Sequence, residues 1–181
     1  RLNDAKHAGF TVTVKVFLES PIGTSGTLQV SGNWGLGGNV KNSSSVNLEP
    51  GASKVIALEL QATATDIKLW WPVGLGEQLL YNIKASFTPS KKESPTLESS
   101  RKIGFRYFAL VTGNDTDPAY VHDSVGKEGT SSLGMWWRIN GAPLWSRGAN
   151  MIPMEELEGR LSGPAHRQLV ESAVGANMNT L

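Results

Sequence analysis

Apolar and polar residues alternate along the first hundred or so positions with a period of two, which is the pattern of β-strands that bury one face. The clearest run is GFTVTVKVFL at 9–18, where every second residue from Phe10 to Leu18 is apolar. Shorter runs bounded by turn residues predict further strands at 26–32, 44–51, 54–62, 66–74, 78–87 and 100–111. No helical pattern lies between them. The predicted fold class is therefore all-β, an antiparallel β-sandwich.

Three connections receive a specific prediction. The strands at 44–51 and 54–62 are expected to pair with each other across a Pro50-Gly51 turn. The strand at 66–74 is expected to end at Pro72, because proline cannot donate to a strand ladder. The run at 100–111 predicts one long strand or two short ones.

The alternation stops at 112–134, a stretch rich in Gly, Ser, Thr and Asp that predicts a long exposed loop. Two aromatic runs then flank Asn140-Gly141, the strongest short signal for a β-hairpin. Ser162 is a predicted N-cap, and apolar residues recur after it at helical spacing. They are Leu169, Val170, Ala173, Val174 and Met178.

A strand followed by an amphipathic helix and then MNTL is the opening of a βαβ unit, whose helix should cover a sheet. The simplest interpretation is a piece of a longer protein that stops just inside a second domain. The predicted domains are a sandwich at 1–112, an exposed loop at 113–134, and at 135–181 a hairpin with a strand–helix unit.

Composition narrows the function classes. The net charge of +1 gives no electrostatic footprint for nucleic acid, and no apolar run is long enough to span a bilayer. The absence of cysteine excludes disulfides, thiolate metal ligands and a cysteine nucleophile. Two sequons, at Asn42 and Asn114, are candidate glycosylation sites and point to a secreted or lysosomal protein.

The adjacent carboxylates Glu155 and Glu156 are tempting as a catalytic pair. Neighbouring residues point in different directions on any regular element, whereas two-carboxylate catalysis needs groups that face each other across a bond. The residues alone therefore favour a solvated turn. The tryptophans at 70, 71, 136, 137 and 145 could stack on sugars, but large aromatic residues in sandwich strands more often belong to the core.

Four motifs change this balance. They are LWWPVGLGEQLLY at 69–81, SRKIGFRYFALV at 100–111, WWRINGAPLWSRGANMIP at 136–153 and ANMNTL at 176–181. In this order they resemble the β-mannosidases of glycoside hydrolase family 2. The resemblance implies an immunoglobulin-like sandwich between a jelly-roll domain and a (β/α)8 barrel, which would be the partners of this chain. It also implies that 145–150 is the first barrel strand and that NMNTL begins the second.

The resemblance further implies an enzyme that hydrolyses terminal β-mannosides with retention, without a metal or other cofactor. Its two catalytic carboxylates would lie beyond Leu181, so no catalytic residue is expected in this chain. Asn150, Met151 and Glu155 would bind substrate, although the family has Trp or Tyr in place of Met151 and Asp in place of Glu155. The alternative is a stand-alone carbohydrate-binding or spacer sandwich.

Overall fold

The chain divides into two compact units in a computed structural model. The sandwich unit consists of Lys6–Trp70 and Leu79–Phe105, and the C-terminal unit of Trp71–Gln78 and Arg106–Leu181 together with the first five residues. The structure describes residues 7–35, 38–91, 93–114, 135–152 and 158–181.

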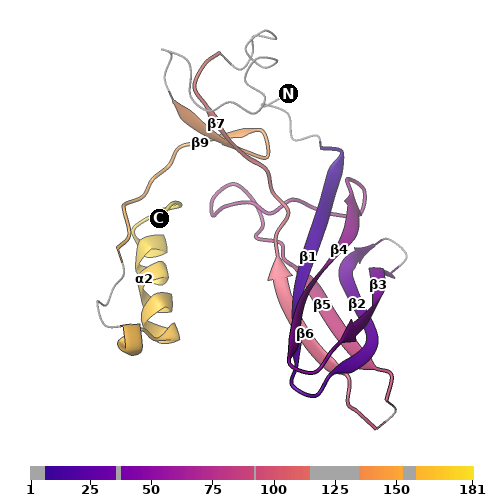
Figure 1. The fold of residues 1–181 in the computed structure, drawn as a ribbon. Helices are drawn as coiled ribbons and strands as arrows, with labels where there is room; N and C mark the ends of the chain where they lie inside the picture. Colours follow the sequence, from indigo (N-terminus) through magenta and orange to yellow (C-terminus); the bar gives the residue numbers. More distant parts are fainter. Residues whose placement is uncertain (1–6, 36–37, 92, 115–134, 153–157) are drawn as a thin grey trace. The chain divides into compact units, whose positions relative to one another are not determined.

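The sandwich unit has two antiparallel layers (Figure 1). In one layer, β1 (Gly9–Ser20) pairs with β4 (Ala52–Thr63) along its whole length. The other layer has the strand order β3-β2-β5-β6, with bounds Gly38–Leu48, Thr24–Gly35, Tyr81–Pro89 and Leu97–Ile103. The sequence prediction of an antiparallel, sandwich-like β-fold is confirmed for this part of the chain.

The core lies between the two layers, where the alternating apolar residues meet. Leu28, Val30, Leu58 and Leu60 are almost fully buried there. Burying a side chain of this kind contributes about 1.5–3 kcal/mol relative to leaving it exposed. The inward half of the period-two pattern is thus the main source of this unit's stability.

Trp34 joins the two layers. Its indole Nε1 donates a hydrogen bond to the Gln61 carbonyl of β4 at 2.9 Å. Its ring meets Phe105 edge-on, with centroids 5.2 Å apart. The ring lies over Gly32, where an added methyl group would overlap it. The absence of a side chain at position 32 therefore decides where Trp34 sits.

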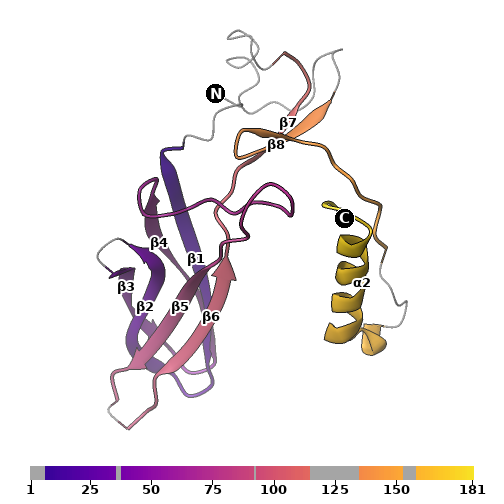
Figure 2. The same cartoon turned by 180° about the vertical axis from the view of Figure 1, so that it is seen from behind.

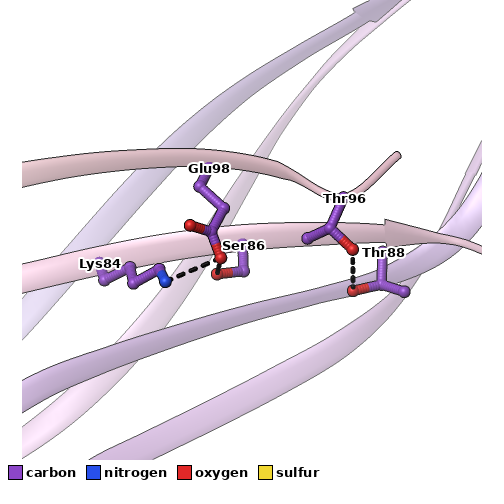
Figure 3. A network of polar contacts seen from close by, with 5 residues as sticks. All are labelled: Lys84, Ser86, Thr88, Thr96 and Glu98. Atoms are coloured by element: carbon purple, nitrogen blue, oxygen red, sulfur yellow. Dashed lines mark hydrogen bonds and ion pairs between the residues drawn. The ribbon is translucent and has the colours of Figure 1, made fainter. Parts of the chain in front are cut away.

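The outer face of β5 and β6 carries polar cross-strand pairs (Figure 3). Lys84 Nζ donates to Glu98 Oε1 at 2.7 Å, and Ser86 Oγ donates to the same oxygen at 3.4 Å. The hydrogen bond from Lys84, with its positive charge and the Ser86 hydroxyl, lowers the pKa of Glu98 below its ordinary value. The pair is solvent-exposed, so we assign it to the register of the two strands rather than to a site.

Two predicted connections are wrong. The strands at 44–51 and 54–62 do not pair: β3 pairs with β2 and β4 with β1, so the Pro50-Gly51 turn carries the chain from one layer to the other. A Pro-Gly turn specifies a change of direction but not a hydrogen-bonding partner. The Gly51 N–H instead donates to the Ser20 carbonyl at the end of β1, at 2.9 Å.

The stretch 66–74 is also not a strand, although the structure describes all of it. Single backbone bonds replace a ladder: Trp70 N donates to Phe105 O at 2.7 Å and Trp71 N donates to Glu77 O at 2.9 Å. Aromatic residues and Pro72 produced an apolar run that resembles a strand, but they anchor an irregular segment instead.

The C-terminal unit begins with a three-stranded sheet, β7 (Phe108–Val111), β8 (Trp136–Ile139) and β9 (Ala142–Leu144). The run at 100–111 is therefore two strands, β6 and β7. The predicted hairpin turn is confirmed, with Asn140 and Gly141 at φ 48° and 82°. Buried Asn140 also binds Tyr107 through two hydrogen bonds, its N–H to the Tyr107 carbonyl at 2.9 Å and its Oδ1 from the Tyr107 N–H at 3.1 Å.

A short 3₁₀ turn, η1 (Glu158–Arg160), precedes helix α2 (Gly163–Gly175). Ser162 is the N-cap as predicted, and its side chain accepts from Ala165 N. None of the helices in the described residues is long and apolar enough to cross a membrane. Most of the predicted loop at 113–134 lies outside the described residues.

Replacing Gly32 with alanine should displace Trp34, because the new methyl group overlaps its ring. We expect a loss of about 1–3 kcal/mol in the free energy of unfolding, the usual cost of overpacking a core. Urea denaturation followed by tryptophan fluorescence measures it. Gly175→Ala is the matched control, because open space surrounds that position. Equal stability of the two variants would contradict the assignment of Trp34 to the core.

Candidate functional site

The segment after β9 and the last residues of the chain come together as neighbouring parallel strands. Gly148 and Thr180 form a parallel bridge, and Asn179 N donates to Arg147 O at 2.8 Å. Helix α2 lies between them in the chain and runs back beside the segment that follows β9 (Figure 2). Residues 145–180 therefore form a strand–helix–strand unit with parallel pairing.

Three side chains fasten this unit, and we call Arg147, Asn177 and Asn179 the Arg–Asn clamp. Arg147 Nε donates to the Asn177 carbonyl at 3.0 Å, and its Nη2 to Asn177 Oδ1 at 3.4 Å. Asn179 Oδ1 accepts from Arg147 N at 2.9 Å, while Asn179 Nδ2 donates to Trp145 O at 3.0 Å. Both backbone and side chains thus tie the end of the helix to the first strand.

Asn177 has φ 60°, in the left-handed region that asparagine tolerates better than most residues. Its N–H donates to the Val174 carbonyl at 2.9 Å, so it ends helix α2 and turns the chain toward Arg147. Sequence reasoning assigned no role to the Arg–Asn clamp. The only available signal was an asparagine just after the last helical residue, a common helix stop.

Gly148 is the point of closest approach in this unit. A methyl group on it would overlap the carbonyl oxygen of Thr180. The two parallel segments can therefore sit at this spacing only while position 148 has no side chain.

The predicted substrate-binding residues have different outcomes. Asn150 and Met151 follow the bridged Gly148 on the same segment, and both are exposed, Met151 by 52%. Glu155 lies outside the described residues, as do Pro153 and Glu156. The structure thus places Asn150 and Met151 just past the C-terminal side of a bridged strand, where ligand sites of parallel α/β folds lie. Their contact with a substrate stays a prediction.

The aromatic residues fall into two groups. Trp70, Trp71 and Trp136 are partly buried, whereas Trp145 is 82% exposed. Trp137 stacks on Phe108 of β7, with centroids 4.7 Å apart and planes inclined by 24°. The core interpretation therefore does not extend to Trp145.

The two sequons lie on the surface. Asn42, in β3, donates its Nδ2 to the Glu59 carbonyl at 2.9 Å, and exposed Asn114 follows β7. Their glycosylation stays a prediction. Among the residues that the structure describes, His, Asp and Glu form no group of three or more that could hold a metal ion.

Replacing Gly148 with alanine should separate the two parallel segments. We expect faster amide exchange at Asn179 and Thr180, because Asn179 N donates to the first strand. The measurement is hydrogen exchange by NMR, with Gly163→Ala as the control, since nothing lies near a methyl group there. Unchanged exchange in the Gly148 variant would show that the parallel bridge is not a stable contact.

Comparison with known proteins gives consistent results. The family model described as glycosyl hydrolases family 2 matches residues 1–106. The chain is 30% identical to the β-mannosidase of Bos taurus over 143 residues, which is 79% of this chain. It is 32% identical to β-mannosidase A of Aspergillus aculeatus over 117 residues, 64% of this chain.

A solved structure, the β-D-mannosidase of Dictyoglomus thermophilum, superimposes with a TM-score of 0.61 over 94% of this chain, at 21% identity. At that identity the likeness shows the fold alone. The chain spans only 15% of the bovine relative, 12% of the Aspergillus relative and 19% of the Dictyoglomus chain. The family match covers more than half of the chain and agrees with the curated relatives, so the chain belongs to glycosyl hydrolase family 2.

Proposed function

We propose that residues 1–181 are a non-catalytic part of a retaining β-mannosidase that hydrolyses terminal β-D-mannosides. In this proposal the sandwich unit is immunoglobulin-like, and residues 145–181 form the first strand–helix unit of a (β/α)8 barrel and the start of its second strand. The observation that carries it is the parallel bridge between Gly148 and Thr180 across helix α2. Parallel strands joined by a helix are the repeating unit of such a barrel.

The chain would contribute structure and part of a substrate pocket rather than the reacting groups. A (β/α)8 barrel takes about 250 residues, so residues 145–181 alone cannot close one. Retaining hydrolysis needs two carboxyl groups about 5–5.5 Å apart, one as acid/base and one as nucleophile. We assign both to parts of the protein outside residues 1–181, which also supply the jelly-roll and barrel partners.

Within this proposal the segment after Gly148 is the rim of the active site. Sites of (β/α)8 enzymes gather at the C-terminal ends of the barrel strands, and Asn150 and Met151 follow the first such strand. Glu155 comes from the same loop and would accept hydrogen bonds from sugar hydroxyls. A charge-assisted hydrogen bond contributes about 1.5–3 kcal/mol. A secreted or lysosomal location belongs to the same proposal and is supported by the sequons at Asn42 and Asn114.

A carbohydrate-binding role of the isolated chain is the second candidate, and the exposure of Trp145 favours it. An exposed indole can stack on a sugar ring. Titration with manno-oligosaccharides separates the two functions: saturable quenching of tryptophan fluorescence that Trp145→Ala abolishes supports the binding module. No saturable change supports the purely structural part.

The purified 181-residue chain should not hydrolyse a chromogenic β-mannoside, because the two carboxylates of the mechanism are assigned elsewhere. The assay compares released chromophore with a protein-free blank over an extended incubation. The full-length protein is the positive control for the substrate. Turnover by the chain that scales with its concentration would overturn the proposal.

In the full-length enzyme, Glu155→Gln should lower kcat/KM for a β-mannoside at least about tenfold, since a loss of about 1.4 kcal/mol is a factor of ten. Glu156→Gln is the matched control and should change kcat/KM little, because adjacent side chains point in different directions. Small and equal effects of both substitutions would return this loop to the solvated-turn interpretation.

A further inference from the structure

The two layers of the sandwich unit are unequal in width. Four strands form one layer, but within the described residues only β1 and β4 form the other. β1 pairs with β4 on one side alone, and β6 pairs with β5 on one side alone. The free edge of β1 is 12 residues long, from Gly9 to Ser20.

Burial is lopsided in the same sense. The inward residues of β4, such as Leu58 and Leu60, are buried, whereas inward Val14 and Val16 of β1 are only half-buried. On β6, Leu97 stands opposite buried Phe87 of β5 and so faces the core side, yet it is 60% exposed. Core-facing residues are therefore left uncovered along the side where β1 ends the smaller layer.

A groove of about 330 Å³ lies at this place. One wall is β1, and the floor is the inner face of β5 and β6. Its lining is Val14, Lys15, Val16, Phe17, Ile83, Ala85, Ser99, Ser100 and Arg101. An apolar floor beside an unpaired backbone edge is the geometry that β-strand addition uses, with main-chain hydrogen bonds on one side and side-chain pockets below.

We propose that this groove is filled by a single extended strand that belongs to the same protein, outside residues 1–181, and that pairs with the free edge of β1. An unprotected edge of this length with alternating apolar residues is an aggregation hazard that native proteins cover. The chain spans 15% of its bovine relative, so a protein of that size has ample sequence to provide the strand.

The groove also defines the composition of this strand. Its inward residues are apolar and alternate, because they meet Ile83 and Ala85 on the floor. The two ionisable side chains that line the groove, Lys15 and Arg101, are both basic. The strand therefore carries a carboxylate near them, which would form a charge-assisted pair.

A second copy of the chain fits the groove less well than a single strand. If the β1 of another copy paired here, its own β5 and β6 would have to lie under the first copy's β1, where the first copy's β5 and β6 already form the groove floor. Two identical layers would then compete for one space. A lone strand brings no second layer with it.

Hydrogen exchange by mass spectrometry tests the proposal on two proteins, the dilute 181-residue chain and the full-length protein. Amides of β1 that do not bond to β4 should exchange at least about tenfold more slowly in the full-length protein, because the added strand accepts them. Equal exchange in both proteins would overturn the proposal. Protection that appears in the short chain only as its concentration rises would assign the edge to a second copy instead.

A variant tests the same groove independently. Ser99 is exposed and lines the groove, so Ser99→Trp should fill it without harming the 181-residue chain. In the full-length protein the same substitution should lower Tm by several degrees, because the indole takes the strand's place. Lys102→Trp, exposed on β6 and outside the groove lining, is the control and should leave Tm unchanged. Equal Tm values for both full-length variants would contradict an occupied groove.

Discussion

The backbone of Gly148 approaches that of Thr180 so closely that no side chain fits between them, and the organisation of the C-terminal unit depends on this contact. It requires the chain to leave β9, form α2 and return in the same direction as it left. The Arg–Asn clamp then fixes the end of the helix to the first strand. A parallel pair joined by a helix is a different principle of construction from the antiparallel layers that precede it, and it marks the change from one type of domain to another.

The sandwich unit depends on a simpler constraint, the burial of every second residue. Trp34 connects the layers because Gly32 leaves room for its ring and Gln61 accepts its N–H. The same alternation shows where the unit is incomplete. Val14 and Val16 belong to the pattern of core residues but reach only half burial, since the smaller layer ends at β1. A core that is sealed on one side and open on the other is typical of a domain built to receive another segment.

Local patterns predicted the elements whose causes are local. The alternation in 9–18 gives β1, the Asn140-Gly141 pair gives the hairpin, and Ser162 gives the start of α2. They failed where partners are distant. Nothing near Pro50-Gly51 indicates that β3 and β4 lie in different layers, because that choice depends on which strand buries which face.

The candidate site shows the same division. Its position came from motifs that resemble a family, and the family is shown by the comparisons. The Arg–Asn clamp was missed because its members are separated by a whole helix and have no shared pattern in the sequence. The aromatic run at 66–74 was misjudged for a related reason: an apolar stretch with proline can anchor a loop through isolated bonds, and composition does not distinguish this from a strand.

The central claim is that this chain supports catalysis by a retaining β-mannosidase without supplying its carboxylates. Retaining enzymes form a covalent glycosyl–enzyme intermediate, which a slowly hydrolysed fluorinated mannoside can trap. The most direct measurement is to label the full-length protein with such a reagent, digest it and locate the modified residue by mass spectrometry. The account predicts a single mannosylated carboxylate in a peptide outside residues 1–181. A label on a carboxylate within 1–181, or no covalent adduct despite turnover, would contradict it.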